Sequence, residues 1–201
     1  RVVYQRIAPA AQRFADLDNA INARADYYEK REQDPGFNGF HRIEYALFDQ
    51  HKVDGLALTV QRLQTDVTGL KQQLMAQTMA PEQLVGIITH NMRSLAEVRS
   101  NGEEERYSRA DLSGFAANLE GTRKVIDLLR PLLAKTAGEL LQRIDAASTA
   151  FGAELDSLKT ESGYRPYDQV ANGQRQQIAD SAKALADALD GIDPALGLKG
   201  L

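Results

Sequence analysis

Apolar residues recur at three- and four-residue intervals along most of this chain, whereas the strict alternation that is typical of strands extends over only a few residues at a time. The clearest stripe lies in residues 55–78, and its buried side is expected to hold Leu56, Val60, Leu63, Val67, Leu70 and Leu74. Pro81 suits the first turn of the next helix. The inward residues of that helix are expected to be Leu84, Ile87, Ile88, Met92, Leu95 and Val98. The pattern therefore predicts long amphipathic helices.

Glycine, proline and polar clusters divide the chain into about seven or eight helical pieces. The predicted helices cover residues 1–14 with a kink or split at Pro9, 17–33, 38–50, 55–78, 81 to about 100, 108–133, 137–159 and 169–190. Asp54 is expected to cap the helix at 55–78, and Ser108 with Asp111 resembles a capping box. Pro131 is expected to distort its helix, and residues 191–201 are expected to be irregular. Long helices with short links and no fixed repeat predict an all-α fold of antiparallel helical bundles.

Composition narrows the classes of function. The net charge of −4 and the absence of a basic block argue against binding nucleic acid through phosphates. The chain has no cysteine, which excludes disulfides, zinc–thiolate sites, iron–sulfur clusters and thiol catalysis. No stretch approaches the roughly 20 apolar residues of a membrane span. No signal peptide opens the chain, and its start at Arg1 inside a helical pattern indicates a processed or trimmed N-terminus.

The segment 39–48 carries the most informative chemistry. On a helix, Glu44 lies about 60° from His41, between Phe40 and Phe48 in the middle of the apolar arc. A buried carboxylate needs a cation, a proton or hydrogen bonds, and His and Glu three residues apart can bind one ion. Imidazole nitrogen with carboxylate oxygen suits Fe, Mn, Zn or Cu. The opposing interpretation is an ordinary ion pair between His41 and Glu44.

Two ligands do not complete a site, so further carboxylates are expected from other segments. Periodicity alone does not choose among the candidates, which are Asp16, Asp18, Asp26, Asp66, Glu104, Glu105, Asp111 and Glu120. The remaining histidines, His51 and His90, are expected in a solvated turn and on a helix surface or boundary, respectively.

Three segments in matching order resemble a known family. The segment Gly-Phe-His-Arg-Ile-Glu-Tyr-Ala-Leu-Phe at 39–48 is similar to the Gly-x-His-x-x-Glu signature of the imelysin-like family, in its EfeO and EfeM branch. Residues 4–18 resemble the opening of that branch, and residues 103–121 resemble its later block. The likeness extends over nearly the whole chain and is therefore more specific than the short motif.

The resemblance implies a single imelysin-like helical domain with approximate sub-bundles 1–101 and 102–201, the first one truncated by the clipped start. It implies a periplasmic metal-binding component of an Efe-type iron uptake system, which would pass iron, or else copper or zinc, to a membrane iron permease or another Efe component. This chain has no room for a cupredoxin domain, and in this respect it resembles the shorter EfeM form. His41 and Glu44 match the family motif, and Glu104, Asp111 and Glu120 lie in the later block; with Asp66 they form the expected ligand set. Where the branch often has Glu, this chain has Ala8, which predicts a poorer or rearranged site.

Two other functions remain as alternatives. Some relatives are associated with acidic polysaccharide such as alginate, and such a role would require a basic cleft formed, for example, by Arg106, Arg109, Arg123 and Lys124. The family has also carried a peptidase label. His41 and Glu44 alone do not supply the ligands and separate general base that a metallopeptidase needs, so we expect no enzyme.

Overall fold

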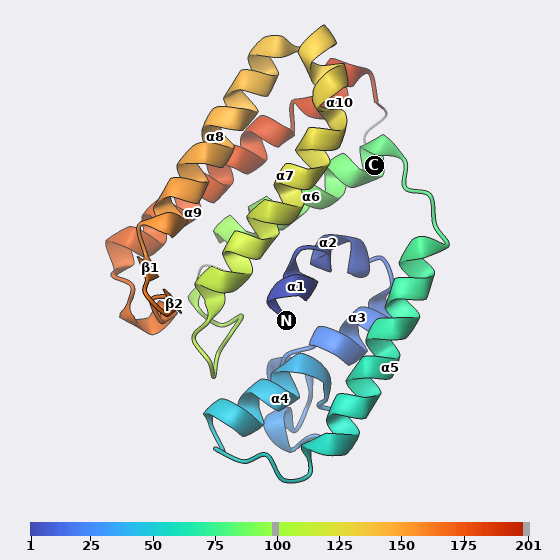
Figure 1. Cartoon of the computed structure of the whole chain (residues 1–201), viewed down its shortest axis with the longest axis vertical. Coiled ribbons are helices and arrows are strands. Elements are labelled where there is room, and N and C mark those ends of the chain that lie inside the picture. The colour runs from blue at the N-terminus through green and yellow to red at the C-terminus, as the bar shows by residue number, and fades with distance from the viewer. Residues whose placement is uncertain (98–100, 199–201) are drawn as a thin grey trace. The chain divides into compact units, whose positions relative to one another are not determined.

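The computed structural model describes residues 1–97 and 101–198, except for the side chain of Pro9, and it is built almost entirely of helices (Figure 1). The all-α class predicted from the apolar spacing is confirmed. Within the described residues, strands are confined to β1 (Lys159–Thr160) and β2 (Gly163–Tyr164), which pair antiparallel with Lys159 opposite Tyr164. None of the described helices is both long enough and apolar enough to cross a membrane.

The chain forms two compact units, and neither is continuous in sequence. Unit 1 consists of residues 1–9, 79–103 and 110–201, and unit 2 consists of residues 10–78 and 104–109. These units do not coincide with the approximate sub-bundles 1–101 and 102–201, because residues 1–9 and 79–101 belong to unit 1 and residues 104–109 belong to unit 2. That the whole chain acts as one domain stays a prediction.

The described residues of unit 1 form a bundle of long helices, to which short α-helices and the 3-10 helix η4 (Tyr167–Gln169) are added. Its long helices are α6 (Pro81–Glu97), α7 (Asp111–Thr136), α8 (Gly138–Asp156) and α9 (Asn172–Leu189). In this bundle α7 packs against α6 and α8, and α9 packs against the same two helices. The short helices α1 (Val2–Gln5) and α10 (Ile192–Leu196) both pack against α7. The core is apolar, and its largest fully buried side chains include Phe115, Phe151, Met92 and Leu133.

A line of buried amides connects α1 to the bundle of unit 1. The side-chain amide of Asn118 donates to Gln5 Oε1 at 3.2 Å and to the carbonyl of Gly114 at 2.6 Å, while Asn91 Nδ2 donates to Asn118 Oδ1 at 2.6 Å. Close backbone approach requires the glycine at position 121, since a Cβ there would lie 2.3 Å from the carbonyl oxygen of Arg6. The N-terminal segment is thus an integral part of unit 1.

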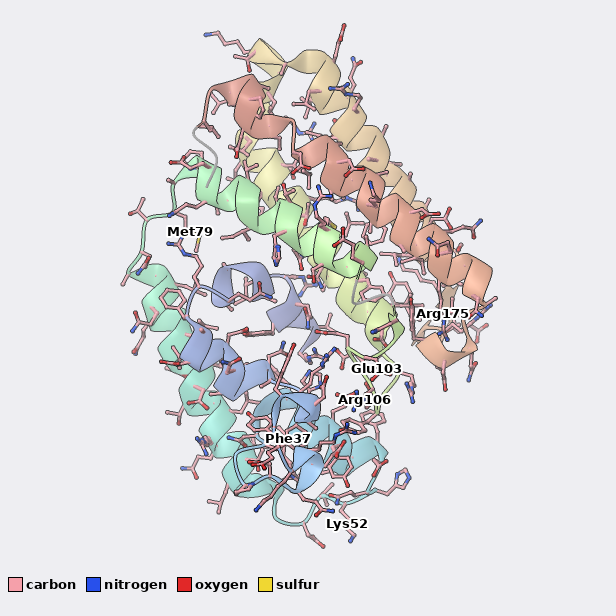
Figure 2. The ribbon with its side chains drawn as sticks, turned by 180° about the vertical axis from the view of Figure 1, so that it is seen from behind. Phe37, Lys52, Met79, Glu103, Arg106 and Arg175 are labelled. Atoms are coloured by element: carbon pink, nitrogen blue, oxygen red, sulfur yellow. The ribbon has the colours of Figure 1, made fainter. Side chains whose placement is uncertain are left out.

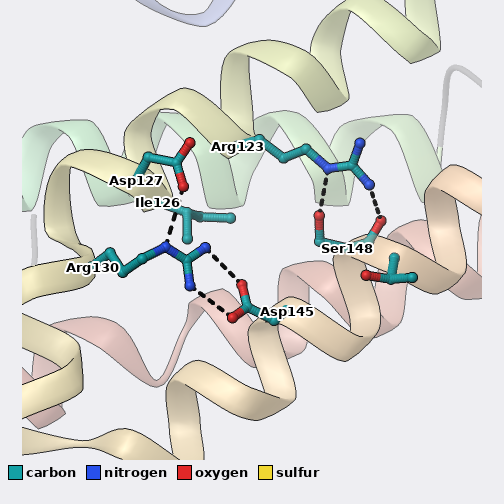
Figure 3. A pocket seen from close by; sticks show the side chains of 7 residues that line it. Arg123, Ile126, Asp127, Arg130, Asp145 and Ser148 are labelled. Atoms are coloured by element: carbon teal, nitrogen blue, oxygen red, sulfur yellow. Dashed lines mark hydrogen bonds and ion pairs between the residues drawn. The ribbon is translucent and has the colours of Figure 1, made fainter.

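A polar pocket of about 280 Å³ lies along α7 and α8 in unit 1 (Figure 3). Arg130 forms two hydrogen bonds with Asp145, of 2.7 and 2.9 Å, and this pairing lowers the pKa of the Asp145 carboxyl. Arg123 donates to the hydroxyl and the carbonyl of Ser148 at 2.9 and 2.8 Å. Both arginines of α7 therefore form hydrogen bonds to α8 and join the two helices.

Unit 2 contains three mutually packed helices and a connecting segment of short turns. Its elements are α3 (Ala15–Asn22), η1 (Ala25–Tyr27), η2 (Arg31–Gln33), α4 (Gly39–Phe48) and α5 (Leu56–Met75). Ile21 and Leu70 are fully buried, and Leu63 and Phe37 are also part of the core. The helix α2 (Ala8–Ala11) spans the point along the chain where unit 1 ends and unit 2 begins.

Several predicted boundaries are corrected by the structure. The expected helix at 17–33 ends at Asn22, because the chain turns extended at Ala23 and buries Ala23 and Ala25 in place of continuing a polar-rich helix. The helix expected at 1–14 is split near Pro9, as predicted, but the break lies between Gln5 and Ala8, and Pro9 is in the first turn of α2, where its missing N–H costs little. The tail contains α10 and is therefore not wholly irregular.

The capping predictions are also wrong. Asp54 does not cap α5; Gly55 precedes the helix with a φ of 81°, and no side chain forms the cap bond. Ser108 does not cap α7, which begins at Asp111, because its hydroxyl is used elsewhere. Of the expected stripe on α5, Val60 and Val67 are each 37% exposed. Pro81 does open α6, as predicted, and Val98 lies outside the described residues.

Candidate metal centre

Helix α4 places His41 and Glu44 one turn apart on its buried side, with 1% and 7% of their surfaces exposed. Gly39 allows the helix to begin there. Its φ is +73°, and a Cβ at this position would lie 2.2 Å from the carbonyl oxygen of Ile21. The start of α4 therefore lies directly on the end of α3, and this contact fixes where both side chains point.

The two side chains are hydrogen-bonded to each other. His41 Nδ1 lies 2.8 Å from Glu44 Oε2. The other carboxylate oxygen, Oε1, accepts hydrogen bonds from the backbone N–H of Tyr107 at 3.1 Å, the backbone N–H of Ser108 at 2.9 Å and the Ser108 hydroxyl at 2.9 Å. Both oxygens of this buried carboxylate are thus engaged, as burial of a charge requires.

These contacts hold Glu44 in its ionised form. Burial by itself would raise the pKa of the Glu44 carboxyl, but the hydrogen bond and charge interaction with His41 and the hydrogen bonds from Ser108 together lower it below its usual value. Since the carboxylate is ionised, His41 Nδ1 carries the proton of the hydrogen bond between them. A negatively charged oxygen beside an imidazole is a pair that can bind a cation.

A third group that could bind a metal comes from the loop 104–109. Glu105 is 7% exposed, and one ligand atom from each of His41, Glu44 and Glu105 lies within 4.8 Å of the others. Within the part of the chain that the structure describes, this is the cluster whose spacing suits a metal ion. One imidazole nitrogen and two carboxylate oxygens form a ligand set suited to Fe, Mn, Zn or Cu.

The same loop is fastened to the rest of unit 2 by polar contacts. The hydroxyl of Tyr107 donates to Glu32 Oε1 at 2.7 Å. This hydrogen bond lowers the pKa of Glu32 and contributes, after burial, to raising that of Tyr107. Glu104 lies 3.9 Å from the guanidinium of Arg24, which also pairs with Asp26 at 2.8 Å.

Aromatic packing adds to this fastening. Tyr107 lies against Tyr45 of α4 with ring centroids 5.1 Å apart, Tyr45 lies 6.4 Å from Phe37, and Phe37 lies 6.0 Å from Tyr28. Phe37 and Arg106 of unit 2 are labelled in Figure 2. The row of rings joins the loop 104–109 to α4 and to the turns that precede it.

The structure brings together some of the residues expected from sequence. His41 and Glu44 lie side by side as predicted. Glu104 belongs to the same unit but pairs with Arg24, and Asp66 is a half-buried residue of α5 outside the three-residue cluster. Their roles as ligands stay predictions.

The other two expected ligands belong to unit 1. Asp111 is fully buried at the start of α7, and Glu120 of the same helix forms an ion pair with Arg6. Their roles as ligands also stay predictions. Glu105 is one of several candidate carboxylates in the sequence and lies outside the expected ligand set. The sequence does not single it out, because three adjacent glutamates at 103–105 have no pattern that distinguishes one from another. Of the remaining histidines, His51 is exposed in the irregular segment that follows α4 and His90 is exposed on α6, so both lie at the surface as expected.

The family described as Imelysin (peptidase M75) matches residues 1–192. The chain belongs to the imelysin family. It is 38% identical over 195 residues to the protein named iron uptake system component EfeO of Escherichia coli strain K12, and the same holds for the proteins of that name in Shigella flexneri and Escherichia coli O157:H7. The resemblance to the EfeO and EfeM branch is thereby confirmed.

The match covers 97% of this chain and 52% of each of these relatives. The chain thus spans about half the length of the curated relatives that it matches. The family name contains the word peptidase, whereas these relatives are named as components of iron uptake.

Proposed function

We propose that this chain is the metal-binding part of a periplasmic iron uptake component, and that it holds iron through His41, Glu44 and Glu105. The observation that carries the proposal is the buried cluster whose ligand atoms lie within 4.8 Å of one another. The 38% identity to relatives named as iron uptake components supports iron as the cargo. Copper and zinc also suit the same ligand types.

The electrostatics of the cluster favour a cation. Glu44 and Glu105 are both buried, and two carboxylates in one site repel each other unless a proton or a positive ion compensates them. Glu44 is held ionised by its donors, so a bound cation would offset the repulsion. A carboxylate–imidazole pair that is already ordered also requires little rearrangement to bind an ion.

We propose transport rather than peptide hydrolysis. A metallopeptidase needs metal ligands and, in addition, a general base that is free to activate water. The cluster supplies three groups, all of which are needed as ligands, and both oxygens of Glu44 already accept hydrogen bonds. Delivery to a membrane iron permease or another Efe component is the corresponding role for a protein that binds the ion and releases it.

The proposal is tested by titrating the chain with ferrous, ferric, copper and zinc ions in a calorimeter. The double variant His41→Ala, Glu44→Ala should lose at least about 100-fold in affinity, since it removes two of three ligands. Glu105→Ala should weaken binding, and His90→Ala, which removes an exposed histidine from α6, should bind like the unaltered chain. Equal affinity of the double variant and the unaltered chain would contradict the proposal.

A further inference from the structure

Glu44 uses its two oxygens for different purposes. Oε1 accepts three hydrogen bonds, from Tyr107 N–H, Ser108 N–H and the Ser108 hydroxyl, while Oε2 faces His41 Nδ1. Three donors gather around this one oxygen, and together they leave no open side from which an ion could approach Oε1. An ion could reach Oε1 only if some of these hydrogen bonds were broken.

All three donors belong to two consecutive residues of the loop that also carries Glu105. Two of the donors are backbone N–H groups, and the third is the hydroxyl of Ser108. Substituting Ser108 can therefore remove one donor to Oε1 without moving the backbone. The same loop therefore supplies a ligand and restrains a neighbouring ligand. We call the three donors to Oε1 the Ser108 clamp.

We infer that the Ser108 clamp makes Glu44 a single-oxygen ligand and thereby selects against large cations such as Ca²⁺; the inference rests on the proposed function. Ca²⁺ takes six to eight oxygen ligands and often binds both oxygens of a carboxylate. Ions that accept few ligands at about 2.0–2.2 Å, such as Zn²⁺, are satisfied by one oxygen. Ser108 is thus a positioning residue that acts through Glu44.

The test compares Zn²⁺ and Ca²⁺ binding in the unaltered chain and in Ser108→Ala, Ser108→Thr and Thr65→Ala. Ser108→Ala uncovers the side of Oε1 that the hydroxyl occupies, so we expect the ratio of Zn²⁺ to Ca²⁺ affinity to fall about 10-fold, at the lower end of the effects seen when a partner of a metal ligand is lost. Ser108→Thr keeps the hydroxyl and should restore the ratio. Thr65→Ala is the matched control, because it removes an exposed hydroxyl of α5 that bonds the carbonyl of Gln61 in its own helix, and its ratio should stay unchanged.

Infrared difference spectra of the Zn²⁺-bound and metal-free protein provide a second readout. The separation between the two carboxylate stretches distinguishes one-oxygen from two-oxygen binding, and Ser108→Ala should shift it toward the two-oxygen value. An unchanged ratio and spectrum in Ser108→Ala, or an equal change in Thr65→Ala, would overturn the inference while leaving the metal site in place. If the unaltered chain bound neither ion nor iron, the proposed function itself would fail.

Discussion

The hydroxyl of Tyr107 donates a 2.7 Å hydrogen bond to Glu32, and this bond joins the loop 104–109, which carries the candidate ligand Glu105, to the turn η2. We predict that Tyr107→Phe lowers the free energy of unfolding by about 1.5 kcal/mol, because a hydrogen bond to a charged acceptor is lost while the ring remains. Urea unfolding measures the change. Tyr27→Phe is the matched control, since Tyr27 is 70% exposed, and a loss as large in the control would contradict the assignment.

The same pair predicts a dependence of stability on pH. The hydrogen bond from Tyr107 lowers the pKa of Glu32 in the folded chain below the ordinary value of 4.5. A carboxyl whose pKa is lowered by folding contributes stability that is present above pH 4.5 and is lost as the pH falls through the lower, folded pKa. Tyr107→Phe should therefore lose less stability than the unaltered chain between pH 5 and pH 3, roughly the window of this titration. Parallel curves of unfolding free energy against pH would refute this.

At Gly39, where α4 begins, adding a single methyl group is expected to lower the stability of the protein strongly. Gly39→Ala would place a Cβ 2.2 Å from the carbonyl oxygen of Ile21, so α4 must move away from α3. We expect a loss of more than about 3 kcal/mol in stability and weaker metal binding, because both His41 and Glu44 follow this helix.

Gly55→Ala is the control for Gly39→Ala. Gly55 also has a positive φ, of +81°, but a Cβ there meets nothing within 4 Å. Only the strain of the backbone conformation is then added, about 1 kcal/mol. Thermal unfolding and zinc titration of both variants measure the difference, and similar effects at the two positions would show that the contact with α3 is unimportant.

The hydrogen bonds among the buried amides of unit 1 predict a loss of stability when Asn118 is replaced. Asn118→Ala removes the acceptor of Asn91 and the donor to Gln5 and leaves both amides in a buried environment, so we expect a loss of about 2–3 kcal/mol. Gln142→Ala on the exposed side of α8 should change stability by less than about 0.5 kcal/mol. Chemical unfolding of the two variants tests the prediction, which fails if Asn118→Ala is as mild as its control.

The pairing of His41 with Glu44 could be predicted from the sequence, because both residues belong to one short segment. His41 and Glu44 share one helix, and their separation by three residues places them on the same side wherever that helix packs. The apolar neighbours in the same stretch then indicate that this side is buried. Such reasoning needs only the period of the helix.

The remainder depends on contacts between distant segments. Glu105 and Ser108 reach Glu44 through a loop that has no periodic pattern, and the Ser108 hydroxyl bonds Glu44 instead of capping α7 because that buried carboxylate competes for it. Likewise, the helix expected over 17–33 ends at Asn22 because burial of Ala23 and Ala25 outweighs local helix preference. Tertiary contacts of this kind are not encoded in spacing.

The assignment of residues 104–109 to unit 2 has a consequence for the order in which the protein is made. When α3, α4 and α5 have been synthesised, Glu44 still lacks the hydrogen bond from the backbone N–H of Tyr107, which lies 63 residues further along the chain. The whole of α6 must be translated before the loop can return to α4. In a nascent chain His41 and Glu44 therefore lack the contacts of the loop, and the complete candidate site forms only after a long-range contact, the kind of event that is slow in folding.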